Sequence, residues 1–323
     1  MDLSPDIISL ASATLRISTP LVFAAMAGLF AERSGVIDFG LEGKMLAAAF
    51  VAASGAHVFG SEWYGLGLAI VCCVALSMLH GFASVTHKGD QGVSCVAINI
   101  LMIGLTTALA AAWFGKQGLT PTLTDDRRFF EITLPFADTV SEVPLLGSIY
   151  SEIISGHYIF VYIAYILVPC VYWVVFKTRF GLRLRAVGEN PSAVDTAGIS
   201  VNLMRYKALA VNGVLVAFAG AYLSTAINAN FFREMSAGRG YLALAALIFG
   251  KWKPKTALIA CLLFGFTDAL QIRLQGVPLP FVGVIPVQFI QALPYVLTVV
   301  LLAGFVGKAI APSAIGQPYI KER

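Results

Sequence analysis

The sequence is poor in charge. Asp, Glu, Lys and Arg make up only 12% of the 323 residues, whereas apolar residues make up 58% and the mean hydropathy is +0.81. Soluble domains carry roughly 25% charged residues, so this chain has too few charges to cover a water-facing surface, and its excess apolar area must face lipid. The sequence also lacks a hydrophilic block long enough to form a soluble domain. We therefore expect one transmembrane domain over residues 1–323.

The usual signatures of enzymes and metal sites are also missing. The sequence has no HExxH or GxSxG motif, its four histidines are scattered singly, and its five cysteines lie in apolar runs without CxxC or Cys/His spacing. None of its Gly-Lys pairs is followed by the Ser or Thr of a Walker A loop. We therefore expect no catalytic centre, resident cofactor, metal site or ATPase in this chain. The N-terminal region lacks a basic stretch and a cleavage site, so we expect its first hydrophobic segment to be retained.

The hydrophobic runs that are present have the length of membrane-spanning helices. A spanning helix needs about 20 apolar residues, and an open sheet cannot cross lipid. The sequence thus predicts an all-α polytopic bundle with about 8–10 transmembrane segments. The candidate segments are 10–31, 41–58, 64–87, 92–114, 158–176, 206–227, 239–250 (too short alone), 256–274 and 286–307.

The charges between these segments predict the orientation, because cytoplasmic loops are rich in Lys and Arg. The connection 177–205, extended to Lys207, holds six Lys or Arg against two acidic residues, and the turn 251–255 reads KWKPK. The connection 115–156 holds three basic and six acidic residues. We therefore expect the first two on the cytoplasmic side of the membrane and the third outside. The C-terminus is then cytoplasmic and the N-terminus outside.

The two halves of the chain, about 10–114 and 206–307, resemble each other. Each contains a helix, a glycine-containing break and a further helix. The turn after the first broken unit, GSEWYG, is acidic, whereas the matching turn GKWKPK is basic, which indicates an inverted repeat. Paired interrupted segments are typical of a transport site, although both breaks could be ordinary loops between tilted helices. The glycines of the breaks are Gly35, Gly40, Gly43, Gly238 and Gly240.

Several polar residues lie at membrane depth, where a charge costs about 2.5–3.5 kcal/mol and therefore faces a cavity or a partner. Asp268 and Gln271 are three residues apart and share a helix face, and Lys44 and Arg239 lie beside the breaks. These groups could line a substrate path, or they could bond neighbouring helices or a second subunit. The candidates for the substrate path are Asp38, Glu42, Asn99, Asn212, Asn228, Asp268 and Gln271.

A short rigid helix is expected within the basic connection. Asn190 can cap a helix that begins with Pro191, residues 192–197 can form that helix, and Gly198 can close it. The connection is longer than two adjacent helices need, which suggests a docking element for a cytosolic partner, although a merely solvated basic loop fits these residues equally well.

This segment resembles the coupling helix of ABC importer permeases in the ribose and branched-chain amino acid permease superfamily. The stretches ERSGVIDFGLEGKMLAAAF (32–50) and GRGYLALAALIFGKWKP (238–254) are similar to its nucleoside or "simple sugar" branch. The three stretches occur in the expected order, and the resemblance covers nearly the whole chain. The residues that match the coupling motif are Gly188, Glu189, Asn190, Pro191, Ala193, Asp195 and Gly198.

The resemblance implies a permease subunit that imports nucleosides by alternating access. It implies as partners a second, related permease in a heterodimer, a cytosolic ATP-binding-cassette protein that carries the ATP and Mg, a periplasmic or lipid-anchored substrate-binding protein, and membrane lipid, but no nucleic acid. Simple sugars and branched-chain amino acids are the competing substrates. The alternatives outside the family are an ion-coupled transporter that works alone with Asp38, Glu42 or Asp268 as its coupling carboxylate, and an intramembrane enzyme or scaffold.

Overall fold

The described chain is built almost entirely of helices, as predicted. The computed structural model describes residues 3–135, 147, 150–275, 278–279, 283–284, 287–293, 296, 299–300 and 310–321. Two antiparallel pairs of two-residue strands complete it. The helices are α1 (Leu3–Arg33), α2 (Leu41–Phe59), α3 (Glu62–Gly81), α4 (Gln91–Phe114), α7 (Ile159–Lys177), α8 (Arg179–Glu189), α9 (Pro191–Thr196), α10 (Val201–Ala221), α11 (Arg239–Phe249), α12 (Pro254–Leu274) and α13 (Val287–Gln291).

Shorter elements join or extend these helices. The π-helical turns η1 and η4 continue α3 and α10, and η2 and β1 lie in the connection after α4. The short elements are η1 (Phe82–Thr86), η2 (Asp125–Arg127), β1 (Glu131–Ile132), η3 (Tyr150–Ile154), β2 (His157–Tyr158), η4 (Tyr222–Ile227), β3 (Pro278–Leu279) and β4 (Gly283–Val284).

Six helices in the described part are long and apolar enough to cross a bilayer. They are Ile7–Arg33, Glu62–Thr86, Gln91–Phe114, Ile159–Lys177, Val201–Ile227 and Pro254–Leu274. Two of the other predicted segments are also helices: α2 is buried along most of its length, which lets it carry charged residues, and α11 has only 11 residues. The predicted segment 286–307 begins with α13, and most of it lies outside the described residues.

The helices pack closely because glycines stand where their backbones touch. α10 packs against α1, α2 and α3, and α1 also packs against α11 and α12. A Cβ on Gly220 of α10 would lie 2.3 Å from the carbonyl oxygen of Met45 on α2, and a Cβ on Gly65 of α3 would lie 2.3 Å from that of Ala52. Small residues at helix interfaces are the usual means of close packing in membranes.

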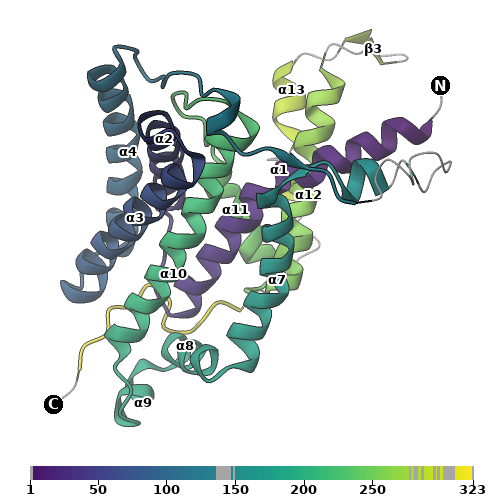
Figure 1. The fold of residues 1–323 in the computed structure, drawn as a ribbon. Helices are drawn as coiled ribbons and strands as arrows, with labels where there is room; N and C mark the ends of the chain where they lie inside the picture. The colour runs from purple at the N-terminus through teal and green to yellow at the C-terminus, as the bar shows by residue number, and fades with distance from the viewer. Residues whose placement is uncertain are drawn as a thin grey trace.

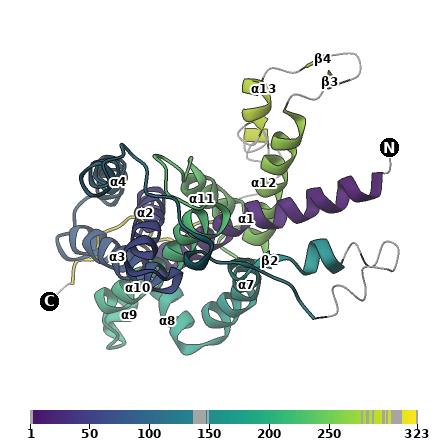
Figure 2. The same cartoon turned by 45° about the horizontal axis from the view of Figure 1, so that its top comes forward.

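The two ends of the bundle carry different elements (Figure 1). The helices α8 and α9 lie at one end together with the C-terminal segment, whereas the N-terminus and α13 lie at the other end. The turned view separates α12 and α13 from the group formed by α2, α3 and α4 (Figure 2). The connection after α4 covers the end of η4, since the N–H groups of Thr120 and Phe129 bond the carbonyls of Phe231 and Thr225.

Candidate functional site

The two helix breaks touch each other through Glu42. This residue lies in the first turn of α2, and its carboxylate oxygens accept hydrogen bonds from the N–H groups of Gly238 and Gly240 at 2.8 and 2.7 Å. The start of an α-helix has N–H groups without a partner and a partial positive charge. Glu42 therefore caps α11 from a position 196 residues before Gly238.

Three of the predicted break glycines are required for the backbone conformation and close packing around this contact. A Cβ on Gly240 would lie 2.6 Å from the backbone nitrogen of Glu42, and a Cβ on Gly43 would lie 2.7 Å from the Cα of Asn99. Gly238 has a φ of +79°, which side chains with a Cβ rarely adopt. The second break can approach Glu42, and α4 can approach the start of α2, this closely only because Gly240 and Gly43 lack a side chain.

The other two predicted glycines shape the first break. Gly35 has a φ of +85°, and its N–H bonds the carbonyl of Glu32, so it turns the chain at the end of α1. Gly40 directly precedes α2, and its N–H donates to Asp38 Oδ1 at 3.2 Å. The first break thus spans residues 34–40, and Glu42 and Gly43 already belong to the helix.

A buried ion pair stabilises the first break. Lys44 Nζ donates to Asp38 Oδ2 at 2.7 Å, and both side chains are fully buried. Lys44 also donates to Asn212 Oδ1 at 3.3 Å, and this oxygen accepts a second bond from Ser77 Oγ at 3.1 Å. The network therefore joins the break to α2, α3 and α10, and it neutralises the charge of Asp38 within the bundle.

Asn99 of α4 connects the first break to α11. Its Nδ2 donates to the carbonyl of Phe39 at 3.0 Å and to Tyr241 Oη at 2.9 Å. Its Oδ1 accepts the N–H of Gly43 at 2.8 Å. Four predicted path residues (Asp38, Glu42, Asn99 and Asn212) thus lie around the first break, and all four hydrogen-bond other parts of the chain.

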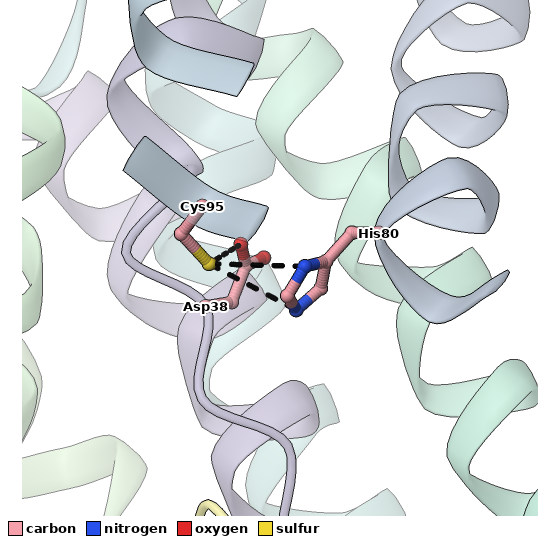
Figure 3. Close-up of side chains that lie close together, drawn as sticks. All are labelled: Asp38, His80 and Cys95. Carbon is pink, nitrogen blue, oxygen red and sulfur yellow. Dashed lines mark hydrogen bonds between the residues drawn. The ribbon is translucent and has the colours of Figure 1, made fainter. Parts of the chain in front are cut away.

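A carboxylate, an imidazole and a thiol also meet beside this network (Figure 3). The possible ligand atoms of Asp38, His80 and Cys95 lie within 4.8 Å of one another. Cys95 Sγ, however, is 3.8 and 3.9 Å from the two ring nitrogens, whereas an ion bound to one nitrogen would place the sulfur clearly nearer to that nitrogen than to the other. His80 Nδ1 already hydrogen-bonds Ser94 Oγ, and His80 Nε2 hydrogen-bonds the carbonyl of Ile37, each at 3.0 Å. The Asp38 carboxylate already pairs with Lys44. The arrangement fits a hydrogen-bonded cluster better than a metal centre.

The remaining predicted path residues lie elsewhere. Asn228 follows η4, and its Nδ2 bonds the carbonyl of Leu223 at 2.9 Å, so it closes the end of its own helix. Asp268 and Gln271 are half-buried on α12. α12 packs against α11, the helix that follows the second break.

At the other end of the bundle, the segment 186–199 has the local structure expected from its sequence. Asn190 Oδ1 accepts the N–H of Ala193 at 3.1 Å, Pro191 occupies the first turn of α9, and Gly198 closes the helix with a φ of +78°. Asp195 pairs with Lys321 at 3.4 Å. Two short helices, α8 and α9, thus form a rigid unit joined by a single capping residue.

This unit contacts the end of α1. A Cβ on Gly188 would lie 2.3 Å from the carbonyl oxygen of Arg33, so α8 and α1 meet backbone to backbone. The Arg33 guanidinium in turn donates to the carbonyl of Trp252, at 3.1 and 2.8 Å. The basic connection and the KWKPK turn therefore lie at the same end of the molecule, as their charges predicted.

The sequence alone did not reveal the partners of these residues. Lys44 is one polar candidate among several in the sequence, and nothing there indicates that it pairs with Asp38. The sequence does not point to Tyr241 or His80 as members of the site, although both hydrogen-bond its residues. A signal was available for Lys44, because a lysine two residues after a glutamate in a helix of small apolar residues requires an internal counter-charge. Tyr241 gave no comparable signal.

Comparisons with known proteins agree with this architecture. Residues 10–311 match the family described as "Branched-chain amino acid transport system / permease component". The chain is 38% identical, over 99% of both chains, to the guanosine ABC transporter permease protein NupQ of Bacillus subtilis. It is 37% identical, over 95% of both chains, to the nucleoside ABC transporter permease protein NupC of Lactococcus lactis.

A more distant match is the guanosine ABC transporter permease protein NupP of Bacillus subtilis, which is 26% identical over 84% of this chain and 77% of its own length. Two different permeases of Bacillus subtilis are thus related to this chain. The chain has several apolar helices long enough to cross a bilayer, so it is a multi-pass membrane protein. It belongs to the family of permease components of the branched-chain amino acid transport system type.

Proposed function

We propose that this chain is a permease subunit of an ABC importer for nucleosides and that it moves its substrate inward by alternating access. The observation that carries the substrate class is the identity of 38% over the full length with a protein named as a guanosine permease. The geometry supports the transport role, because two interrupted helices meet inside the bundle, and such interruptions surround the substrate in many transporters.

The two short helices α8 and α9, residues 179–196 and from here on called the coupling unit, are the proposed connection to an ATPase. Apolar side chains of α8 and α9, together with Arg183 and Glu189, line a groove. The groove lies at the end of the bundle that the charges place in the cytoplasm. A short rigid element suits the transfer of a rigid-body movement. We propose that a cytosolic ATP-binding-cassette protein docks there and holds the ATP and Mg.

We further propose that the chain works beside a second, different permease and receives substrate from a binding protein at the outer face. Two matching permeases in Bacillus subtilis, both named for guanosine transport, support the heterodimer. The N-terminus would then lie outside and the C-terminus in the cytoplasm, in keeping with their positions at opposite ends of the bundle (Figure 1).

The proposal can be tested by measuring uptake of labelled guanosine, uridine, glucose and leucine in cells that lack this chain and in cells that regain it. Nucleoside uptake should depend on the chain, and uptake of the sugar and the amino acid should not. Dependence of glucose or leucine uptake instead would assign the chain to another substrate class of the same family. Uptake by the purified chain alone, without nucleotide, would refute the ABC mechanism.

A further inference from the structure

Two aromatic side chains are exposed where the helix breaks meet. Phe39, in the first break, is 41% exposed, and Tyr241, in the first turn of α11, is 51% exposed. Asn99 Nδ2 donates to the carbonyl of Phe39 and to Tyr241 Oη. A single amide group therefore fixes both residues in neighbouring positions beside Glu42.

This exposed surface does not suit lipid. Non-helical backbone at membrane depth is tolerated only where it is buried in protein or lines a water-filled cavity. The second break also exposes the charged side chains of Arg233 and Glu234, which are 65% and 58% exposed. A Cβ on Gly118 would lie 2.9 Å from the Cβ of Arg233, so the part of the second break beside the connection after α4 is suited to water and polar solutes.

We infer that Phe39 and Tyr241 form a binding site for the base of a transported nucleoside. An aromatic face binds any nucleobase by stacking, which is worth about 1–3 kcal/mol per base. Stacking also suits a transient site, because it needs no buried polar partner that would hold the substrate tightly. The inference rests on the proposed nucleoside transport and adds the residues that contact the base.

The test is uptake of guanosine and uridine by the complete transporter in proteoliposomes, at saturating binding protein. Tyr241→Leu and Phe39→Leu should lower guanosine uptake about tenfold, the factor that corresponds to about 1.4 kcal/mol of lost stacking. The loss should be smaller for uridine, whose base has a smaller aromatic face. Tyr241→Phe keeps the ring and should retain most of the uptake. Phe59→Leu is the matched control, because Phe59 is 61% exposed at the far end of α2.

Uptake by the two leucine variants at the wild-type rate would overturn the inference, as would an equal loss in Phe59→Leu. If the leucine variants do not assemble, Tyr241→Trp provides a second measurement, since a stacked guanosine should quench the added fluorescence relative to the wild type, and absence of quenching would contradict the site. Failure of the wild-type transporter to move any nucleoside would refute the proposed function instead.

An independent observation concerns the C-terminal segment 310–321, which crosses the end of the bundle beside α8. The N–H of Ala314 bonds the carbonyl of Gly188 at 2.8 Å, and the N–H of Gly316 bonds that of Gly35 at 3.0 Å. Ser313 donates to Glu189 Oε2 through its hydroxyl and its N–H, at 3.0 and 3.3 Å. The segment is therefore bound both to the coupling unit and to the first helix break.

A buried arginine fixes this segment from inside. Arg205 of α10 is completely buried, and its Nη1 donates to the carbonyl of Gln317 at 3.1 Å. Its Nη2 would lie 3.2 Å from a Cβ on Gly35, so the guanidinium fills the space between the segment and the break. Its Nε and Nη2 have no acceptor among the described residues, so the Gln317 carbonyl is a contact that the buried charge depends on.

We propose that the segment 313–317 transmits movement of the coupling unit to the first helix break. This proposal rests on the docking role of α8 and α9. Gly316 has a φ of +75°, and a Cβ there would lie 2.8 Å from Ile37 Cδ1. Gly316→Ala should therefore push the Ile37 side chain of the first break aside without touching the docking groove. Gly60→Ala is the control, since Gly60 has a similar φ of +71° but no heavy atom within 4 Å of a Cβ.

The complete transporter should bind its ATPase equally well with Gly316→Ala and with Gly60→Ala. Gly316→Ala, and also a chain that ends at Ala311, should hydrolyse ATP but move at least about fivefold less substrate per ATP. Wild-type uptake per ATP in both would overturn the role of the segment. Loss of ATPase binding by Leu182→Asp, whose exposed apolar side chain lines the docking groove, with unchanged binding in the tail variants, separates the docking role from the role of the segment.

Discussion

The buried pair of Asp38 and Lys44 leads to a prediction about the stability of the folded chain. Neither side chain has any exposed surface, and their charged atoms lie 2.7 Å apart. Removal of one partner from a buried ion pair leaves an uncompensated charge, which costs about 3–5 kcal/mol, whereas replacement of both partners by neutral groups of similar size is often nearly neutral. Asp38→Asn and Lys44→Met should therefore each destabilise the folded chain strongly, and the double variant should regain most of the loss.

Thermal unfolding of the detergent-solubilised chain, followed by size-exclusion chromatography, measures this difference. Asn at position 38 can still accept the N–H of Gly40, so the single variant mainly removes the charge. The three variants and the wild type form a double-mutant cycle, which isolates the interaction between the two residues. Single variants as stable as the wild type, or a double variant whose loss equals the sum of the two single losses, would refute the assignment of a structural ion pair.

Three further predictions concern transport. Gly240→Ala should reduce uptake at least about tenfold, because the added Cβ would lie 2.6 Å from the Glu42 nitrogen and force the breaks apart. Gly60→Ala should leave uptake unchanged, and uptake by proteoliposomes compares the two variants. Glu189→Lys should insert normally but fail to couple ATP hydrolysis to uptake, because it reverses a charge at the docking groove, and normal coupling would contradict that role. Asp268→Ala should lower uptake severalfold if the half-buried carboxylate lines the path, and unchanged uptake would make it a structural residue.

Local features of this chain were predictable from sequence because the interactions that create them are local. The cap of α9 involves Asn190 and Ala193, three residues apart, and the helix closes at Gly198. Hydrophobic length likewise located most of the long helices. The break glycines were recognisable as interruptions, but their purpose was not, since Gly240 is needed for its approach to Glu42 on another helix.

The interactions between the polar residues could not be predicted in the same way. Asp38, Glu42 and Asp268 were equivalent candidates in the sequence, because each is a carboxylate within an apolar region. Their environments differ only through tertiary contacts, with Lys44 beside Asp38 and the start of α11 beside Glu42. The bonds from Glu42 to the second break join residues almost 200 positions apart, and nothing in the local pattern specifies that register.

These differences bear on the choice between an ATP-driven and an ion-coupled mechanism. A coupling carboxylate must exchange its proton or ion with the transport path during each cycle. Asp38 is fully buried against a lysine, and both oxygens of Glu42 are bonded to the start of α11. Release of either carboxylate would break the contacts that hold the two breaks together, so only Asp268 remains accessible enough for ion coupling. With the other two acting as structural supports, the contacts of these carboxylates agree better with the proposed supply of energy from an ATPase through the α8–α9 unit than with ion coupling.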